Sequence, residues 1–374
     1  MMISLRGLNR TLLTRQLLVD RVPMAPFETI RHLVAVQGQE PNWPYIGLWT
    51  RLTDFRHDDL AVLIHERKVV RSTMLRRTVH LAHADDFTWI RPTVAPIVRA
   101  AFSSPFYADE TKGLDLDEVH QVGRELLAGR TLTRREYGRL MAERYPGRNG
   151  GRLASVAELM SAMVHGPEAA AWGRWGSPPS VSVTLAEEWS GLPMATAPEP
   201  ERLVLRYLAA FGPASVMDVQ TWAGITRLRA VMAGMRDELR VVRDEEGREL
   251  YDLPDAPIAD PDRPVPVRFL PAFDNALLGH KDRRRVIDEE DRRRYAKVAS
   301  GGVPMFLVDG FVQGVWTVRK STLTVAPFRP LPDEDAEAVL AEAERLRTFI
   351  GGELTIDFVE DGSAPINNLQ AGSR

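Results

Sequence analysis

Two histidines and two aspartates lie close together in the sequence, where they could bind a metal ion. The stretch is His80-Leu81-Ala82-His83-Ala84-Asp85-Asp86, and histidine and carboxylate side chains are common ligands of zinc and other transition metals. A strand is predicted to end and a helix to begin here, so the histidines point apart and the aspartates belong to the first helical turn. We therefore predict no metal site. The chain contains no cysteine, which also excludes thiolate ligands and iron–sulfur clusters.

Other familiar catalytic motifs are missing from the sequence. The glycine-rich segment 147–151 lacks the Lys-Ser or Lys-Thr pair of a nucleotide-binding P-loop, and we predict a turn there. Neither a dinucleotide fingerprint nor the nucleophile elbow of a serine hydrolase occurs. The residue types alone therefore predict no nucleophile, no acid–base pair and no bound cofactor.

Basic residues gather in two regions of a chain whose formal net charge is −3. Residues 331–374 hold 10 acidic and 3 basic residues, a net charge of −7, which leaves +4 for residues 1–330. The two basic regions contain Arg71, Arg76 and Arg77, and Arg283, Arg284 and Arg285. Such clusters neutralise DNA phosphates when they share one face of the protein. For the second region, a solvated surface with interleaved acidic residues is the alternative.

Residues 199–253 have the sequence pattern of a winged helix. Apolar residues recur at helical spacing over 199–211, Ser215 and Thr226 are placed to cap two further helices, and Gly224 separates them. Alternation on both sides of 244–247 predicts a β-hairpin. Three short helices followed by a hairpin form a helix-turn-helix with a wing, and the third helix of this motif usually enters a DNA groove. A small α+β packing module without DNA contact is the alternative.

A similar order of elements occurs twice earlier in the chain. In the first 110 residues, we predict helices over 8–18, 26–37, 44–52, 58–67 and 84–102, with two strand-like runs in 69–82. From residue 115 onward, we predict helices over 115–127, 133–144 and 155–164, followed by short strands near 170–175 and 180–185. The segments share the order of their elements and not their residues, so the repeat is one of architecture.

The last third of the chain is predicted to be rich in β-strands. Strand-like runs cover 265–270, 303–308, 311–318, 322–326 and 354–358, and an amphipathic helix covers 332–350. The dipeptide Asp309-Gly310 between two of the runs is a strong hairpin signal. We therefore predict an α+β fold with winged-helix domains at 1–110, 111–195 and 196–257, followed by a β-rich C-terminal domain at 258–374.

Four short motifs together have a familiar order. They are Gln37-Gly38-Gln39; Arg77-Thr78-Val79-His80-Leu81; Leu270-Pro271-Ala272-Phe273-Asp274-Asn275 together with segment 282–287; and Val308-Asp309-Gly310. Over roughly residues 5–350 this set resembles the AlkZ-type DNA glycosylases, a family of tandem winged-helix proteins. The family's Gln-x-Gln signature usually has an aliphatic residue in the middle. Glycine stands there in this chain, and we expect it to leave the local backbone freer.

The resemblance implies that Gln37 and Gln39 are catalytic residues of a DNA glycosylase. Glutamine neither takes nor gives a proton at neutral pH, but its amide can hold a water and turn a carbonyl dipole toward positive charge. That is sufficient for a purine alkylated at N7, because the cationic base leaves without protonation through a transition state resembling an oxocarbenium ion. On an ideal helix Gln37 and Gln39 would lie about 200° apart. We therefore expect a helix to end at this motif.

The basic clusters and the motifs of this resemblance together indicate which groups contact DNA. We expect contacts from Arg71, Arg76, Arg77 and His80, from Arg283–Arg285, and from the turn at Asp309 and Gly310, which would enter the minor groove. No run of aromatic residues near Gln37 predicts an enclosed pocket for a flipped base. The site is therefore expected to recognise the sugar and the cationic leaving group, and to tolerate large N7 substituents.

The predicted function is that of a monofunctional DNA glycosylase that removes N7-alkylated purines, including bulky adducts and interstrand crosslinks. It is monofunctional because the motif has no lysine to form a Schiff base with the sugar. A winged-helix regulator without catalysis is the main alternative, and a protein that sequesters a genotoxin is another. We expect a monomer that binds double-stranded DNA containing alkylated purines, in the cytoplasm and associated with the nucleoid. No segment approaches the ~18 apolar residues of a membrane helix, and the N-terminus lacks the apolar core of a signal peptide.

Overall fold

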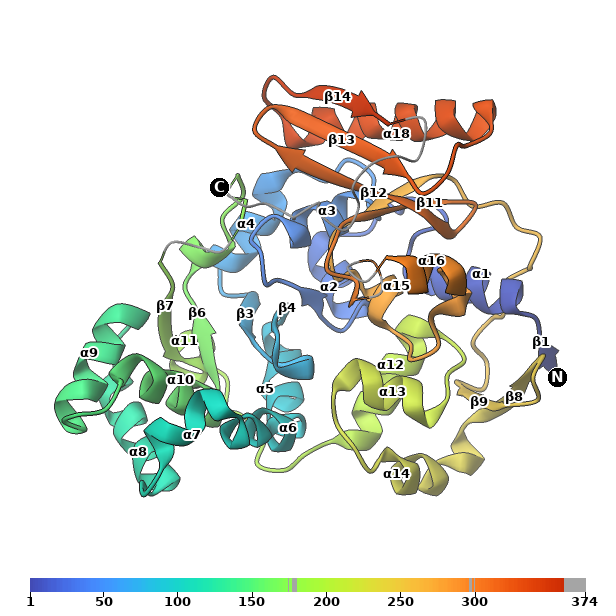
Figure 1. Cartoon of the computed structure of the whole chain (residues 1–374). Helices are drawn as coiled ribbons and strands as arrows, with labels where there is room; N and C mark the ends of the chain where they lie inside the picture. Colours follow the sequence, from blue (N-terminus) through green and yellow to red (C-terminus); the bar gives the residue numbers. More distant parts are fainter. Residues whose placement is uncertain (174, 177–179, 296–297, 299, 360–374) are drawn as a thin grey trace.

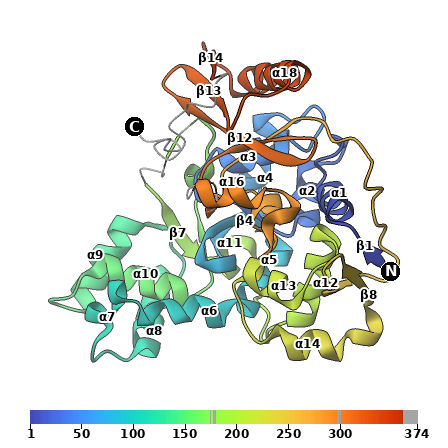
Figure 2. The same ribbon diagram turned by 45° about the vertical axis from the view of Figure 1, so that its right-hand side comes forward.

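The computed structural model describes residues 1–173, 175–176, 180–295, 298 and 300–359. The mixed α+β fold predicted from the sequence is confirmed, with three small sheets and one five-stranded sheet set among the helices of this part of the chain (Figure 1). The five-stranded sheet and helix α18 (Asp333–Ile350) form one end of the molecule, and Figure 2 shows α18 beside this sheet. None of the helices that the structure describes is long and apolar enough to cross a membrane.

The first sheet carries the paired glutamines. Its strand order is β2-β4-β3, and both pairings are antiparallel. Strands β3 (Val69–Thr73) and β4 (Val79–His83) form a hairpin around the 3-10 turn η1 (Leu75–Arg77), and β2 (Val36–Gln37) pairs with the other edge of β4. The helices of this part of the chain are α1 (Leu5–Arg15), α2 (Pro26–His32), α3 (Trp43–Trp49), α4 (His57–His65), α5 (Ala84–Thr93) and α6 (Ala95–Arg99).

The second part of the chain has a hydrophobic cluster of its own, formed by buried residues between Val119 and Leu185. The sheet has the order β5-β7-β6. Its strands are β5 (Leu132–Thr133), β6 (Met163–His165) and β7 (Ser182–Leu185). The helical elements are η2 (Ala100–Ser103), α7 (Pro105–Thr111), α8 (Leu116–Leu127), α9 (Arg134–Arg144), α10 (Gly150–Met160), η3 (Pro167–Ala170) and α11 (Ala186–Ser190).

The third part has the predicted order of three helices followed by a hairpin. The elements are α12 (Pro200–Phe211), α13 (Val216–Ala223), α14 (Leu228–Gly234), η4 (Arg236–Glu238), β8 (Arg240–Asp244) and β9 (Glu249–Asp252). Ser215 caps α13 as predicted, in a reciprocal capping box with Asp218, and Gly224 ends the helix with a φ of 78°. Strand β1 (Met2–Ile3) adds to β8 in parallel, so the N-terminus completes this sheet.

The C-terminal sheet has the order β10-β11-β12-β13-β14. Its strands are β10 (Arg268–Leu270), β11 (Met305–Val308), β12 (Phe311–Arg319), β13 (Thr322–Pro327) and β14 (Thr355–Phe358). Between β10 and β11 lie α15 (Asn275–Leu278), η5 (Arg283–Arg285) and α16 (Glu289–Arg294). The predicted two-residue turn between β11 and β12 is present, with positive φ angles at Asp309 and Gly310.

The hydrophobic cores connect segments that are far apart in the sequence. One cluster joins Leu12 and Leu75 to Leu208 and Val315, and another joins Trp43 and Leu81 to the buried residues of β10, β12 and α18. The N-terminal and C-terminal parts of the chain therefore share cores, and the four-unit division stays a prediction. The shared cores fix the strand of paired glutamines against residues from the C-terminal third.

Several predicted helices have different bounds in the structure. The helix predicted over 8–18 is α1 at Leu5–Arg15, and the one predicted over 84–102 is divided into α5, α6 and η2. The helix predicted over 26–37 ends at His32, because Val34 takes a φ of 69° and the chain then enters β2. The helix predicted over 155–164 begins at Gly150, because the Asn149 side chain accepts a hydrogen bond from the amide of Arg152, and it ends at Met160. Asparagine was the stronger N-cap signal in this segment.

Two smaller predictions are also wrong. Thr226 does not cap α14, since Arg227 with a φ of 67° precedes the helix and the side chain of Gln220 accepts the hydrogen bond from the Leu228 amide. A side chain from the preceding helix thus satisfies the amide that a cap would have satisfied. The segment near 170–175 contains no strand in its described residues, and the 3-10 helix η3 stands before it.

Candidate active site

Gln37 is the last residue of β2, at the edge of the first sheet, and Gln39 lies in the bend that follows it. Gln37 pairs with His80 in the register of β2 and β4, and the amide of Gly38 donates to the carbonyl of Val79 at 2.9 Å. The predicted helix end at this motif is therefore wrong. A helix would have placed the two side chains about 200° apart. The end of β2 and the bend after it instead bring both glutamines to one cavity.

The two glutamine side chains have different surroundings. The Oε1 atom of Gln37 accepts a hydrogen bond of 2.8 Å from the backbone amide of Gln39, and the Gln37 residue is 5% exposed. Gln39 is exposed, and its amide group has no hydrogen-bond partner among the described residues. Gly38 also has a steric reason to be glycine, since an added Cβ would lie 2.5 Å from Cδ1 of the buried Leu81. The side-chain amide of Gln37 is thus fixed by a hydrogen bond, and, within the described part of the chain, the side-chain amide of Gln39 is free.

The cavity beside the glutamines has a volume of about 440 Å³. Four separate parts of the chain form its walls: strand β2, the turn between β3 and β4, helix α13, and the region from 273 to 300. Its lining consists of Gln37, Gln39, Arg76, Thr78, Thr221, Phe273, Leu278, Arg283 and Ser300. These described residues offer amides, hydroxyls, guanidinium groups and apolar surface, and no carboxylate.

Arg71 donates hydrogen bonds to the backbone of the motif from the buried side of the sheet. Its Nε donates to the carbonyl of Gly38 at 3.0 Å, and its Nη2 donates to the carbonyl of Gln39 at 3.2 Å. The residue is 3% exposed, so its guanidinium is not available to a DNA phosphate. The sequence placed Arg71 among the DNA contacts, and the structure places it behind the motif instead. A buried guanidinium satisfies several carbonyls at once because its donors lie in one rigid plane.

The Arg71 guanidinium also connects the motif to the second part of the chain. Its Nη1 lies 2.5 Å from Nδ1 of His165, and Nε2 of His165 lies 2.9 Å from Oε1 of Glu158. Arg134 binds the same carboxylate with two nitrogens. Arginine can only donate, so Nδ1 of His165 accepts and Nε2 carries the proton that is donated to Glu158.

The protonation states of this chain of contacts follow from burial. Burial lowers the pKa of His165 to about 4, against the opposing effect of Glu158, so the ring is neutral at neutral pH. Burial also lowers the pKa of Arg71 to about 10, with Arg134 contributing. Burial alone would raise the pKa of Glu158, but the hydrogen bond from His165 and the charge of Arg134 lower it overall. An ionised carboxylate therefore lies behind the motif, connected to it by three successive hydrogen bonds.

The segment before α15 also holds the glutamine motif in place. Asn275 donates to the carbonyl of Ala35 at 2.8 Å, just before the glutamine strand. Asp274 caps α15 and binds Arg51 with both carboxylate oxygens, at 2.8 and 2.9 Å. Phe273 takes a φ of 61° and lines the cavity. A phenylalanine in the left-handed region is uncommon and costs conformational energy, which is typical of functional sites.

The turn between β3 and β4 forms one wall of the cavity. Arg76 and Arg77 have positive φ angles of 52° and 63°, and an added Cβ on Gly224 would lie 2.8 Å from Cα of Arg76. The end of α13 therefore packs directly on this turn, which brings Thr221 to the cavity. Arg76 donates to the carbonyl of Trp222, and burial, with Arg283 nearby, lowers its pKa to about 10. Arg76 and Arg283 face the cavity, and Arg77 is exposed.

The remaining predicted DNA contacts are spread over different environments. His80 is fully buried, and burial together with Arg76 lowers its pKa to about 3, so it is a neutral support of the strand. Arg285 is also buried and donates to the carbonyl of Pro213. Arg284 is bound by Asp282 and Glu246. Neither His80 nor Arg285 is accessible to DNA in this structure, and the charge of Arg284 is neutralised at the surface.

The Asp309-Gly310 turn packs against α1 and does not project freely. Asp309 forms ion pairs with Arg6 and Arg10, and the carbonyl of Gly310 accepts a hydrogen bond from Asn9. An added Cβ on Gly310 would lie within 2.8 Å of atoms of Arg10 and Asn9. We therefore do not retain the expectation that this turn enters the minor groove.

Sequence reasoning missed five residues of the cavity wall, and one of them, Thr78, lies in the motif at 77–81 that resembled a known family. Thr221, Phe273, Leu278 and Ser300 reach the cavity only through tertiary packing, and no local pattern distinguishes the first, third and fourth. Phe273 had a signal, because it lies in the motif at 270–275 that resembled a known family. Within the described ranges, no three histidine, aspartate or glutamate side chains come together as a metal site.

Comparison with known proteins gives three concordant results. A family model described as "DNA glycosylase AlkZ-like" matches residues 30–349. A protein of Streptomyces sahachiroi, named interstrand DNA cross-link repair glycosylase, is 26% identical over 364 residues, which cover 90% of this chain and 94% of that protein. The solved structure of Streptomyces sahachiroi DNA glycosylase AlkZ is similar in fold, with a TM-score of 0.78 and 24% identity. That match covers 96% of this chain and 100% of the solved one.

Proposed function

The chain belongs to the AlkZ-like family of DNA glycosylases, and we propose that it hydrolyses the N-glycosidic bond of N7-alkylated purines, including bulky adducts and interstrand crosslinks. The enzyme acts on DNA, as its family does. The name of the Streptomyces sahachiroi relative, which repairs interstrand crosslinks, supports this class of lesion.

The observation that carries the proposal is the chemistry of the cavity beside Gln37 and Gln39. Its described lining has no carboxylate, and neither an amide nor an arginine can protonate a leaving base at neutral pH. The base must therefore leave without help from an acid. A purine alkylated at N7 meets this condition, because it already carries a positive charge and departs as a neutral base.

The two glutamines have separate roles in the mechanism that we propose. The hydrogen bond between Gln37 and the Gln39 amide fixes the backbone of the motif, and the unpartnered amide of Gln39 holds the attacking water beside C1′. The transition state resembles an oxocarbenium ion, so carbonyl dipoles that point toward the sugar stabilise it. Water attacks C1′ as the bond to N9 breaks, the bonding electrons return to the cationic base, and the water gives up a proton to the solvent as it becomes the hydroxyl at C1′.

We propose that Arg71 is a positioning residue for this reaction. It holds the carbonyls of Gly38 and Gln39 from the protein interior and has no path to the lesion. Preorganised dipoles are effective only when they do not reorient during the reaction. The buried contacts from Glu158 through His165 to Arg71 supply that rigidity.

Arginines at the cavity bind the phosphates on either side of the damaged nucleotide in this proposal. Arg76 and Arg283 line the cavity, and they would repel a cationic base, so a phosphate is their appropriate partner. Arg77, exposed on the same turn, contacts the next phosphate. Three winged-helix units and a β-rich unit, with the bounds predicted from the sequence, would surround the duplex as a monomer.

The test is a DNA duplex with one 7-methylguanine, incubated with the enzyme and then heated in alkali to cleave abasic sites. We expect cleavage at the lesion only after incubation with the enzyme, and no covalent complex when borohydride is present, because no lysine lines the described cavity. A variant with alanine at both Gln37 and Gln39 is the matched control. Failure of the folded wild-type protein to release 7-methylguanine would exclude this function and favour a non-catalytic DNA-binding protein.

A further inference from the structure

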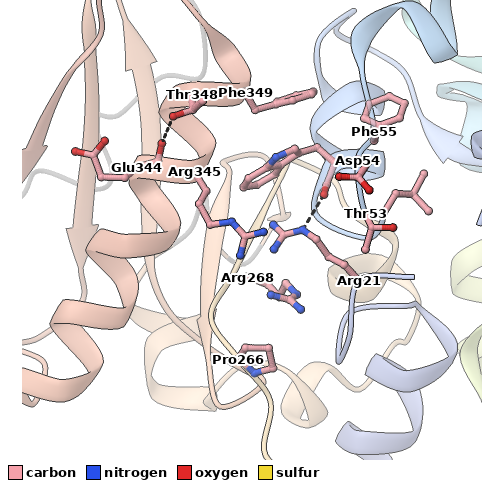
Figure 3. A pocket seen from close by; sticks show the side chains of 12 residues that line it. Arg21, Thr53, Asp54, Phe55, Pro266, Arg268, Glu344, Arg345, Thr348 and Phe349 are labelled. Carbon is pink, nitrogen blue, oxygen red and sulfur yellow. Dashed lines mark hydrogen bonds between the residues drawn. The ribbon is translucent and has the colours of Figure 1, made fainter. Parts of the chain in front are cut away.

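A second cavity, with a volume of about 770 Å³, lies apart from the glutamines and shares no lining residue with their cavity. Four segments of the chain form it: Arg21, residues 49–55 at the end of α3 and after it, residues 266–268 at the start of β10, and the C-terminal end of α18. Figure 3 shows the guanidinium groups of Arg21, Arg268 and Arg345 gathered on one side, with the ring of Phe349 near the opposite wall. Like charges collect in this way only where another charge offsets them.

Arg268 is a buried cation without an ionic partner of its own. It is 5% exposed, its nitrogens donate to the carbonyls of Val267, Leu18 and Val19, and within the described ranges it has no carboxylate within ion-pair distance. Burial lowers its pKa to about 10, and Arg21 contributes to the shift. A buried cation is stable mainly when an opposite charge lies close to it.

The carboxylates of the region do not balance the three arginines. Glu342 is the only carboxylate shared by Arg21, at 2.6 Å, and Arg345, at 3.7 Å, among the described residues. Glu344 is bound by Arg347, which does not line the cavity. One further carboxylate, that of Asp54, reaches the rim. The arginine side of the cavity therefore keeps an excess of positive charge.

Hydrogen-bond donors also remain available on these side chains. Arg21 uses Nε for the carbonyl of Trp49 and Nη2 for Glu342, which leaves Nη1 toward the cavity. Arg345 has only its 3.7 Å ion contact, and 63% of its side chain is exposed. Two guanidinium groups with free donors can bind an oxyanion in a fork, the geometry that suits phosphate.

We propose that this cavity is a second binding site, specific for a phosphate group held between Arg21 and Arg345. The inference goes beyond the glycosylase activity, because this cavity shares no lining residue with the cavity of the glutamines. Trp49, Phe55 and Phe349 give it an apolar wall, so the phosphate belongs to a larger molecule: either a free nucleotide-like anion or a phosphodiester of bound DNA. Both sources share the same recognition chemistry.

The first experiment measures the binding of inorganic pyrophosphate by calorimetry at constant ionic strength. Arg345→Gln removes a guanidinium from the cavity, and Arg139→Gln removes the same charge from an equally exposed position outside it, on α9. We expect Kd to rise by about tenfold or more in Arg345→Gln, the size of a lost charge-assisted hydrogen bond, and to stay near the wild-type value in Arg139→Gln. Both side chains are 63% exposed, so folding is preserved.

The second experiment identifies the source of the phosphate. Binding of an undamaged duplex is measured over a range of salt concentrations for the same two variants. If the phosphate is part of DNA, Arg345→Gln reduces the salt slope by about 1 relative to Arg139→Gln, and pyrophosphate competes with the duplex. If it belongs to a free ligand, the slopes agree while pyrophosphate binding is still lost in Arg345→Gln. Absence of pyrophosphate binding, or equal binding by wild type and Arg345→Gln, would overturn the proposal.

Discussion

Nη1 of Arg71 lies 2.5 Å from Nδ1 of His165, and this contact joins the strand behind the paired glutamines to a strand of the second sheet. The same guanidinium donates to the carbonyls of Gly38 and Gln39. One planar group therefore fixes the backbone of the motif and is itself fixed from the second part of the chain. Glu158 completes the path by accepting a hydrogen bond from His165.

The first prediction concerns His165. His165→Leu removes the acceptor that orients Arg71, and we expect the single-turnover rate of base release to fall by about tenfold or more, the equivalent of ~1.4 kcal/mol. His165→Gln offers an amide oxygen toward Arg71 and an amide NH toward Glu158, so it should recover most of the rate. DNA affinity should not change in either variant, because no side chain of this path reaches the surface facing DNA.

Ser72→Ala is the matched control for this prediction. Ser72 donates to the carbonyl of Met163 and so links the same two strands, without contact to the glutamine motif. Its loss should lower the free energy of unfolding by about 1 kcal/mol and leave the rate unchanged. Equal losses of rate in His165→Gln, His165→Leu and Ser72→Ala would show that the path acts only through stability.

The second prediction concerns the glutamines. We expect Gln39→Ala to lower the single-turnover rate by about tenfold or more through loss of the positioned water. Gln37→Ala should lower the rate at least as much, because it also removes the acceptor that fixes the backbone amide of Gln39. Gln37 is buried, so its replacement should cost about 1 kcal/mol of unfolding free energy as well, which urea titration measures. Full activity of the double variant would contradict the assignment.

Much of the fold was predictable from the sequence because local signals agreed with each other. The capping box at Ser215 and Asp218, the glycine after α13 and the Asp309-Gly310 turn each have a direct steric or hydrogen-bonding cause. The motif at Gln37 was different. Its chain continues from a helix into a strand whose partner, β4, lies more than forty residues later, so no local pattern could reveal the pairing.

The roles of the arginines were the least predictable part of the site. Arg71, Arg76 and Arg77 are close in sequence, yet one supports the motif, one lines the cavity and one is exposed. This separation arises because Arg71 lies on the buried strand β3, whereas Arg76 and Arg77 lie in the turn after it and both have positive φ angles. Charge clusters in a sequence indicate where cations are concentrated, but only packing decides which of them reach a ligand.

The third prediction concerns stability in acid. Burial lowers the pKa of His165 to about 4 and that of His80 and His280 to about 3, each from 6.5. All three are neutral in the folded state, and the unfolded chain binds protons first as the pH falls. Their effect on stability is thus absent above pH 6.5 and grows as the pH falls toward 4. Each histidine should reduce the free energy of unfolding by about 1.4 kcal/mol per pH unit in this window.

Urea titrations at several pH values between 7 and 4.5 measure this effect. His165→Gln removes one titrating group while it keeps both hydrogen bonds, so its stability should fall less steeply with decreasing pH than that of the wild type. An identical slope in the two proteins would mean that His165 is protonated in the folded state, which is incompatible with acceptance of a hydrogen bond from Arg71.

The last prediction concerns lesion size, for which the assumption that no pocket lies near Gln37 has to be replaced. The sequence indicated no pocket near Gln37, but a cavity of about 440 Å³ is present, with Phe273 in its wall. Two arrangements are possible: the damaged base enters the cavity, or the sugar and its phosphates do and the base stays outside. The second fits the chemistry better, because Arg76 and Arg283 attract phosphates and repel a cationic base. It also removes the limit on the size of the N7 substituent.

We therefore expect a bulky N7 adduct to be excised within about an order of magnitude of 7-methylguanine, a difference of ~1.4 kcal/mol, and a crosslink between two N7 atoms to be unhooked. Phe273→Ala separates the two arrangements, because it enlarges the cavity without removing a charge. If the base lies outside, the ratio of the two excision rates stays the same in wild type and variant. A bulky adduct that is refused by the wild type and accepted by Phe273→Ala would instead mean that the cavity encloses the base and selects by volume.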